Sequence, residues 1–191
     1  VQNGFAFAVV DAPVIIADGL RGKSETAVTI NQKRFKKAYI GSEIVQAHSL
    51  VSVAHFKGHE LSGFGGTLKN VGMGCASRKG KMAQHADVAP KVKSKKCIGC
   101  GECILICPES AIEIEWNQAV PTFLENMVEY TAGVLKNKAG KCLFVNFITH
   151  VSPACDCYGF SDAAIVPDLG ILAARDPVAL DQACADLVNQ A

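Results

Sequence analysis

One run of eleven residues, 97–107, constrains the fold of this chain more than any other feature. It holds four cysteines at the spacing C-x2-C-x2-C-x3-C, and Pro108 follows directly. At this spacing one tight loop can direct three soft thiolates at three corners of a cubane iron–sulfur cluster. Gly99 and Gly101 permit backbone turns that a Cβ would obstruct. The run therefore predicts a loop wrapped around a [4Fe–4S] cluster.

Other uses of these cysteines fit the spacing less well. A structural zinc site has two cysteine pairs that are separated by a dozen or more residues. A thioredoxin-like dithiol would need only the first two cysteines and would leave the other two unexplained. A disulfide framework is typical of small secreted chains, and this sequence shows no secretory segment. The predicted cluster ligands are Cys97, Cys100, Cys103 and Cys107.

Composition is that of an ordinary globular protein with one core. Of 191 residues, 49% are hydrophobic and 19% are charged, and the net charge is +1. This balance argues against nucleic acid or a membrane surface as the main partner. Nine cysteines without a signal peptide favour a reducing cytoplasm, where metal instead of disulfides would hold the thiols. The chain begins with Val1 and not with methionine, which is typical of a fragment or a processed form, so we expect an α/β domain truncated at its N-terminus.

Three apolar runs predict strands. Residues 14–17, 50–54 and 142–148 are rich in β-branched and aromatic side chains, and the first run ends in a predicted turn at Asp18 and Gly19. Continuous apolar strands are typical of sheets that are covered on both faces. We therefore expect the α/β class, with a mixed or mostly parallel sheet and flanking helices.

Helical patterns lie on either side of the cysteine run. Apolar residues at helical spacing predict a helix that begins near Pro121 and stops before Gly140. Asp176 followed by Pro177 predicts the N-cap and the first turn of a second helix. A weaker pattern predicts a short helix at residues 42–47.

A cysteine-rich insert thus interrupts the predicted α/β domain. We expect residues 1–92 and 119–191 to form that domain and residues 93–118 to form a small ferredoxin-type insert. Lysines lead into the insert, and they favour a solvated linker over a docking patch for an acidic redox partner, with both interpretations open. These lysines are Lys91, Lys93, Lys95 and Lys96.

The single copy of the cysteine run leaves its cluster incomplete. Two-cluster ferredoxins carry the motif twice, and the fourth cysteine of each run ligates the other cluster. Cys107 would then serve a second cluster, and the first would need a ligand from elsewhere in the chain. Cys155 and Cys157, on either side of Asp156, are the best source, because two thiolates in one loop can converge on one metal. The alternative is a pair of small buried side chains.

Three cysteines remain outside these two groups. Cys75 lies in a glycine-flanked loop, which suits the close approach of a cofactor. Cys142 opens a predicted strand and Cys184 lies in a predicted helix among apolar residues. For the last two, packing in the core is the better interpretation.

A second candidate site follows the strand at residues 50–54. In open α/β sheets, ligands bind at the carboxyl ends of strands. The two histidines there could bind a divalent metal, or serve with a lysine and a glutamate as acid, base and anion contact. A glycine-rich loop, residues 63–66, follows and could direct amides at an anion. The alternative is that the glycines allow close packing and the histidines bond to the backbone. The candidate catalytic residues are His55, Lys57, His59 and Glu60.

Several short strings of the sequence resemble one known family. They are Ala-Asp-Gly-Leu at 17–20, His-Phe-Lys-Gly-His-Glu at 55–60, Gly-Phe-Gly-Gly-Thr-Leu-Lys-Asn at 63–70, Gly-Met-Gly-Cys at 72–75, Cys-Asp-Cys at 155–157 and Asp-Pro-Val-Ala at 176–179. Together they resemble the DUF362 family of bacterial and archaeal iron–sulfur proteins, over nearly the whole chain. The resemblance implies an intracellular α/β protein with [4Fe–4S] centres, often from an anaerobe and often with a ferredoxin-type insert.

The resemblance also implies a set of cluster ligands. Cys75, Cys155 and Cys157 belong to the recurring strings of the family, while Cys142 and Cys184 do not. With the four cysteines of the run, this leaves seven thiolates, one short of two all-cysteine clusters. The eighth ligand could be Asp156 or a histidine, or it could be absent.

Three functions are compatible with the sequence. The leading prediction is an iron–sulfur protein with one or two [4Fe–4S] clusters that exchanges electrons with a redox partner protein. The alternative is a redox enzyme whose small-molecule substrate or metal binds beside the two histidines and is fed by the cluster. The third is a non-catalytic protein that handles metal or clusters. Whether the chain is an enzyme stays open at this level.

Overall fold

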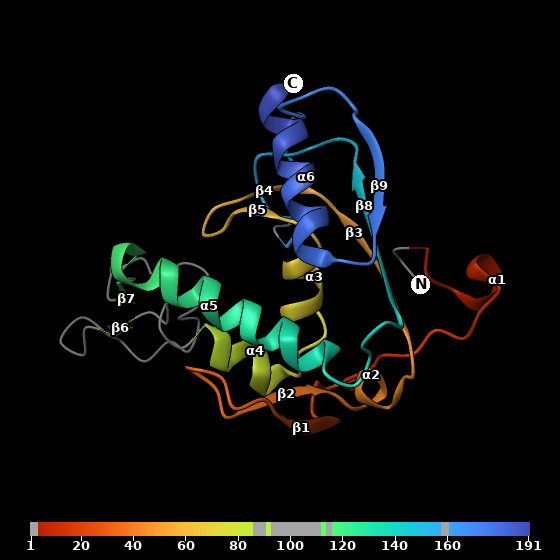
Figure 1. Ribbon diagram of the computed structural model, residues 1–191, viewed down its shortest axis with the longest axis vertical. Helices are drawn as coiled ribbons and strands as arrows, with labels where there is room; N and C mark the ends of the chain where they lie inside the picture. Colours follow the sequence, from red (N-terminus) through yellow and green to blue (C-terminus); the bar gives the residue numbers. More distant parts are fainter. Residues whose placement is uncertain (1–3, 86–90, 93–111, 114–115, 158–160) are drawn as a thin grey trace.

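The centre of the structure is a three-stranded sheet of order β3-β8-β9, shown in Figure 1. The computed structural model describes residues 4–85, 91–92, 112–113, 116–157 and 161–191, so the cysteine run at 97–107 lies outside the described residues. Strands β3 (Leu50–His55) and β8 (Cys142–Ile148) run parallel, and β9 (Gly170–Ala174) pairs with β8 antiparallel. Helices flank this mixed sheet, which confirms the predicted α/β class.

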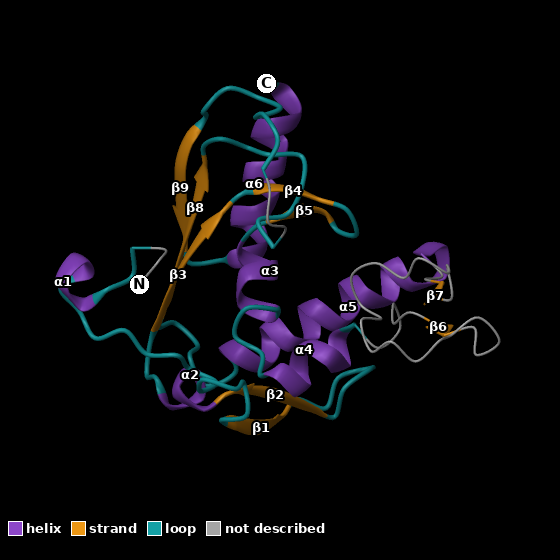
Figure 2. Cartoon of the chain, turned by 180° about the vertical axis from the view of Figure 1, so that it is seen from behind, coloured by secondary structure: helices purple, strands orange, loops and turns teal. Residues whose placement is uncertain are grey.

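Two helices cover one face of the sheet, as Figure 2 shows from behind. They are α3 (Thr67–Gly72) and α6 (Pro177–Gln190). Leu180 and Cys184 of α6 are buried with Phe144 of β8 in the main core. The predicted N-cap of α6 is confirmed, because the Asp176 carboxylate accepts hydrogen bonds from the first backbone N–H groups of the helix.

A second group of elements lies below this sheet in the views of Figures 1 and 2, and we call it the hairpin layer. Strands β1 (Glu25–Thr29) and β2 (Lys37–Gly41) pair antiparallel, and Ala38 and Ile40 of β2 are fully buried in the same core as Tyr130. The layer also includes α2 (Ser42–Gln46), α4 (Arg78–Gln84) and α5 (Trp116–Leu135). Helices α2 and α6 occupy the predicted ranges.

Five short elements complete the described chain. Strands β4 (Lys57–His59) and β5 (Gly63–Gly65) form a tight hairpin after β3. Strands β6 (Lys91–Val92) and β7 (Ile112–Glu113) pair antiparallel; β6 precedes the predicted insert and β7 lies within it. Helix α1 (Phe7–Val10) lies near the N-terminus. The boundaries proposed for the insert stay a prediction.

Two expectations about the strands were wrong. Residues 14–17 do not form a strand, and Val14, Ile15 and Ile16 are each more than half exposed, because an apolar run becomes a strand only where a neighbouring strand can pair with it. The sheet is also not covered on both faces within the described residues: Val51 and Val53 of β3 are exposed while the alternating Ser52 and Ala54 are buried.

The long helix α5 begins five residues earlier than the proline pattern predicts. It starts at Trp116 and contains Pro121 as its sixth residue, where proline has no N–H to donate to the carbonyl four residues earlier and so removes one hydrogen bond of the helix. Among the described residues, no helix combines the length and the apolar character that crossing a membrane requires.

Candidate functional site

The candidate site lies at the carboxyl ends of the two parallel strands. His55 is the last residue of β3, and the loop after β8 begins at Thr149. His150 turns this loop with φ of 48°, a conformation that histidine adopts more readily than most residues. Because parallel strands end at the same edge of a sheet, polar groups from distant parts of the chain meet here.

His55 and Lys57 converge on one carboxylate, that of Asp156. The His55 Nδ1 atom lies 2.8 Å from Asp156 Oδ2, and the Lys57 Nζ atom lies 3.0 Å from the same oxygen. The other ring nitrogen of His55, Nε2, lies 2.9 Å from the carbonyl oxygen of Thr149. Both ring nitrogens thus face acceptors, and they satisfy both only when each carries a proton. Burial alone would raise the pKa of Asp156, but the hydrogen bonds from His55 and Lys57 outweigh it and lower that pKa.

Beside this carboxylate lies a sulfur atom with two hydrogen-bond donors. Lys69 Nζ of α3 donates to Cys155 Sγ at 2.6 Å, and the backbone N–H of Cys157 donates to the same sulfur at 3.3 Å. Burial raises the pKa of the Cys155 thiol, but hydrogen bonds from Cys157 and Lys69 outweigh burial and hold the pKa below its ordinary value. Burial and the neighbouring Cys155 raise the pKa of Cys157. Cys155 is therefore the better nucleophile or metal ligand of the pair.

His59 and Glu60 border the same group. His59 Nδ1 accepts hydrogen bonds from the backbone N–H groups of Leu61 and Ser62, at 3.1 and 3.2 Å. Burial, and next the positive charge of Lys69, lower the pKa of His59 from 6.5 to about 4, so the ring is neutral at pH 7. Glu60 Oε1 accepts a longer hydrogen bond, 3.4 Å, from the backbone N–H of Cys155.

A buried carboxylate from α6 fixes the start of α3, which carries Lys69. Asp181 is 1% exposed, and its two oxygens accept hydrogen bonds from the backbone N–H groups of Thr67 (2.7 Å) and Leu68 (2.8 Å). Asn146 of β8 donates to the same carboxylate at 2.8 Å. A Cβ at Gly66 would overlap this carboxylate, so the glycine permits the close approach.

Gly58 has a comparable packing role on the other side of the site. Its N–H donates to the carbonyl of Ser152 at 2.8 Å, and a Cβ at this position would overlap the backbone of Pro153. The hairpin β4–β5 is thereby held against the loop that carries Cys155. Close packing, the alternative considered for the glycines of residues 63–66, thus accounts for Gly66, and Gly58 has the same role.

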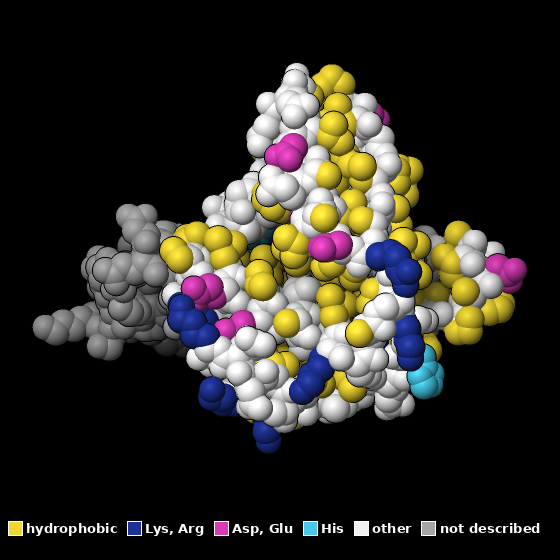
Figure 3. All heavy atoms as spheres, viewed as in Figure 1, with side chains coloured by type: hydrophobic (Ala, Val, Ile, Leu, Met, Phe, Trp, Pro, Cys, Tyr) yellow, Lys and Arg dark blue, Asp and Glu magenta, His cyan; other side chains and the backbone are white. Residues whose placement is uncertain are grey.

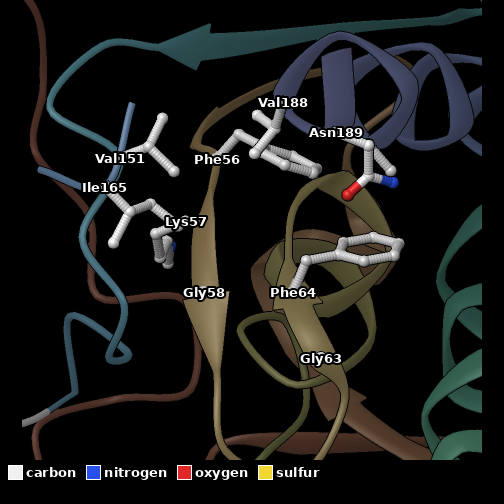
Figure 4. A pocket seen from close by; sticks show the side chains of 10 residues that line it. Phe56, Lys57, Gly58, Gly63, Phe64, Val151, Ile165, Val188 and Asn189 are labelled. Carbon is white, nitrogen blue, oxygen red and sulfur yellow. The ribbon is translucent and has the colours of Figure 1, made fainter. Parts of the chain in front are cut away.

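A cavity of about 360 Å³ lies beside the polar group, and Figure 4 shows the side chains that line it. It lies between the β4–β5 hairpin and α6, and the stacked rings of Phe56 and Phe64, 5.2 Å apart, form part of its wall. Lys57 contributes to this lining and also contacts Asp156, so cavity and polar group are neighbours. The cavity is within the size range of small-molecule sites. Its lining consists of Phe56, Lys57, Gly58, Gly63, Phe64, Val151, Ile165, Ala185, Val188 and Asn189.

The structure does not bring Cys75 to this site. Cys75 packs against the main core, and burial raises its pKa to about 11 while Lys81 and Lys138 act in the opposite direction. Cys142 is half-buried at the start of β8, and Cys184 is fully buried in α6, where Asn146 Nδ2 lies 3.4 Å from its sulfur. Within the described ranges, no three His, Cys, Asp or Glu side chains form a group that could hold a metal ion. A role for Cys75 as a ligand stays a prediction without support from the described geometry.

Two sites that the sequence suggested separately therefore form one. His55 and Asp156 are 101 positions apart in the sequence, yet their side chains are in contact. Sequence reasoning did not assign roles to Lys69 or Asp181. For Lys69, the signal in the sequence was a lysine three residues after a glycine-rich loop. For Asp181, it was a carboxylate on the buried side of an apolar helix.

Comparison with known proteins identifies the family. The chain matches the family described as "Domain of unknown function (DUF362)" over residues 1–186. The chain belongs to the DUF362 family. This DUF362 chain is also similar to Ferredoxin-2 of Desulfomicrobium norvegicum, with 53% identity over 30 residues. The match covers 16% of this chain and 51% of the ferredoxin, so it spans about half the length of that relative.

The described residues can be compared with what a cubane cluster requires. Such a cluster takes four cysteine thiolates. Cys155 and Cys157 offer two adjacent sulfurs, and Lys69 and a backbone amide are in place to stabilise negative charge on one of them. The two sulfurs could therefore supply two of the four ligands. The four cysteines of the run lie outside the described residues: Cys97, Cys100, Cys103 and Cys107.

Proposed function

We propose that this DUF362 protein binds a [4Fe–4S] cluster through the run at residues 97–107 and transfers electrons to or from a partner protein. The observation that carries the proposal is the C-x2-C-x2-C-x3-C-P run, which occurs once in the chain. The similarity to a ferredoxin over 30 residues supports it. Cys97, Cys100 and Cys103 are the proposed ligands of one cluster.

The remaining ligands are proposed from the cysteines outside this triplet. Cys107 and the pair Cys155 and Cys157 are the sulfurs that would complete this cluster or hold a second one. When bound, the cluster would accept and release single electrons. The chain's own part is to stabilise the thiolate of Cys155, through hydrogen bonds from Lys69 and from the N–H of Cys157. Hydrogen bonds to cluster sulfurs raise the reduction potential, so Lys69 would also be a determinant of that potential.

Anaerobic purification followed by iron and sulfide analysis tests the proposal. We expect brown protein with about four or eight iron atoms per chain, the content of one or two cubanes. Electron paramagnetic resonance of the dithionite-reduced protein should show the signal of a reduced cubane. Replacing Cys100 by alanine should remove iron, whereas replacing the core residue Cys184 should not. A colourless protein that contains zinc and intact thiols would refute the proposal.

A second candidate is a redox enzyme, and the convergence of His55, Lys57 and Asp156 beside a cavity favours it. An acid–base pair next to an apolar cavity is the usual form of a small-molecule site. Its test is a thermal-shift comparison of the wild type and Asp156→Asn with a panel of small carboxylic acids, aldehydes and amides. An enzyme should be stabilised by one compound class in the wild type alone. A pure electron carrier should respond to none, while its iron content stays the same in both proteins.

A further inference from the structure

The charges of this protein are divided unevenly between its two layers. The hairpin layer together with its adjoining loops, counted over residues 17–49, 76–85 and 120–141, carries twelve Lys and Arg against five Asp and Glu, a net charge of +7. The sheet layer, residues 50–75, 142–157 and 161–191, carries three basic and seven acidic residues, a net charge of −4. The whole chain has a net charge of only +1. In Figure 3, Lys and Arg side chains follow the lower part of the molecule, over the hairpin layer.

Within the hairpin layer, basic side chains surround a hollow of about 520 Å³. Its floor forms where Gly22 meets the start of α4, because the N–H of Arg78 donates to the Gly22 carbonyl at 3.2 Å and a Cβ at Gly22 would press against the Arg78 side chain. The lining residues are Gly22, Lys23, Glu25, Arg78, Lys79 and Met82.

The cations around the hollow are of two kinds. Lys79 is held in place, since its Nζ lies 3.6 Å from the centre of the Tyr39 ring and 3.9 Å from Glu25 Oε1. Lys23 and Arg78 are exposed, and neither has an ion pair within the described part of the chain. Exposed cations without a carboxylate partner retain their full capacity to attract an anionic surface.

We propose that this hollow is the docking site for an acidic surface of another protein. Met82 is 68% exposed at the hollow, and methionine and arginine are enriched where proteins meet. Nucleic acid is the less suitable partner, because Glu25 lies in the hollow and the net −4 sheet layer would repel a long polyanion. An acidic protein surface presents its carboxylates within one patch. The positive hairpin layer would attract that patch and the negative sheet layer would repel it, so the partner would be oriented before contact.

Fluorescence anisotropy with two labelled probes tests this docking site on the intact protein. The probes are a 20-residue peptide with four clustered glutamates among serine and glycine residues, and a single-stranded 20-nucleotide DNA, each titrated at 50 and 200 mM NaCl. We expect the peptide to bind more tightly than the DNA and to lose at least tenfold in affinity at the higher salt concentration, because exposed charges are screened. The double variant Lys23→Glu with Arg78→Glu should bind the peptide at least tenfold more weakly at low salt.

Arg175→Glu, compared with the single variant Arg78→Glu, provides the control for net charge, since each changes the net charge by −2 and Arg175 is exposed in the sheet layer. It should leave peptide affinity within twofold of the wild type. Circular dichroism should show that each variant is folded. Tighter binding of the DNA, an absence of peptide binding, or an equal loss in the Arg175 variant would each overturn the proposal.

Discussion

Replacing Asp181 by asparagine should destabilise the protein at the point where its two sequence halves meet. The carboxylate comes from α6 near the C-terminus, and it accepts hydrogen bonds from the first N–H groups of α3 and from Asn146 of β8. Asparagine has nearly the same shape, so the change removes the charge and one acceptor without creating a cavity. Any effect then comes from hydrogen bonding and not from packing.

The magnitude follows from the contacts that change. Hydrogen bonds to a charged group contribute about 1.5–3 kcal/mol each, against roughly 1 kcal/mol for a neutral pair. In the variant one amide oxygen can still accept from Thr67, but the amide nitrogen then faces the N–H of Leu68, and leaving a buried donor unpaired costs about 1–3 kcal/mol. Removing a negative charge from a helix N-terminus adds a further 0.3–1 kcal/mol or so. We expect a total loss of about 3 kcal/mol in the free energy of unfolding.

Thermal unfolding followed by circular dichroism at 222 nm provides the assay. For a chain of this size a loss of about 3 kcal/mol corresponds to a fall in Tm of roughly 6–12 °C. Asp186→Asn is the matched control, because Asp186 is exposed on the same helix and accepts one hydrogen bond from Gln182, one turn earlier. The control should lower Tm by less than about 2 °C. A similar small change for Asp181→Asn would show that the buried carboxylate does not hold α3 in place.

Three further predictions concern the site. Burial and Lys69 lower the pKa of His59 from 6.5 to about 4, so between these pH values the unfolded chain binds a proton that the folded protein does not. The free energy of unfolding should therefore fall by roughly 1–3 kcal/mol from pH 6.5 to 4. His59→Gln should flatten the dependence of Tm on pH over the same interval. Gly58→Ala should cost about 1–3 kcal/mol in chemical denaturation, because its Cβ overlaps the neighbouring backbone, and an unchanged midpoint would contradict that packing. Cys155→Ala should reduce iron per chain while Cys184→Ala should not; equal losses would mean that the cysteines are divided wrongly.

The central strands were predictable because their apolar runs are long and their pairing is parallel. Strand β8 has the predicted bounds, 142–148, and β3 extends one residue beyond the predicted end. Strands β1 and β2 were missed, since their alternation of small, polar and apolar residues gives little signal before the partner is known. The run at 14–17 shows the converse error: high β-propensity without a partner strand gives no strand.

The candidate site was predictable in its parts but not in its assembly. His55 follows a strand in the sequence, and ligands favour strand ends, so its position was accessible from pattern alone. Its contact with Asp156 was not, because that contact depends on the parallel pairing of β3 with β8 across a long intervening segment. Cys75 stays a predicted ligand, but the glycines beside it have a packing role in the described structure, since Gly72 and Gly74 accommodate the close approach of neighbouring backbone.

The polar residues of α3 explain how so short a helix can position a functional group. Six residues are too few for a stable isolated helix, so tertiary contacts must hold it. Thr67 donates to Asn146 of β8, and Asn70 donates to Ser52 of β3, so both of these side chains bond to the sheet beneath the helix. Lys69 differs, because the acceptor of its hydrogen bond is the sulfur of Cys155. With the helix held at its start by Asp181, the Lys69 ammonium is fixed relative to that sulfur, and stabilising a thiolate there is the chemical result of the whole arrangement.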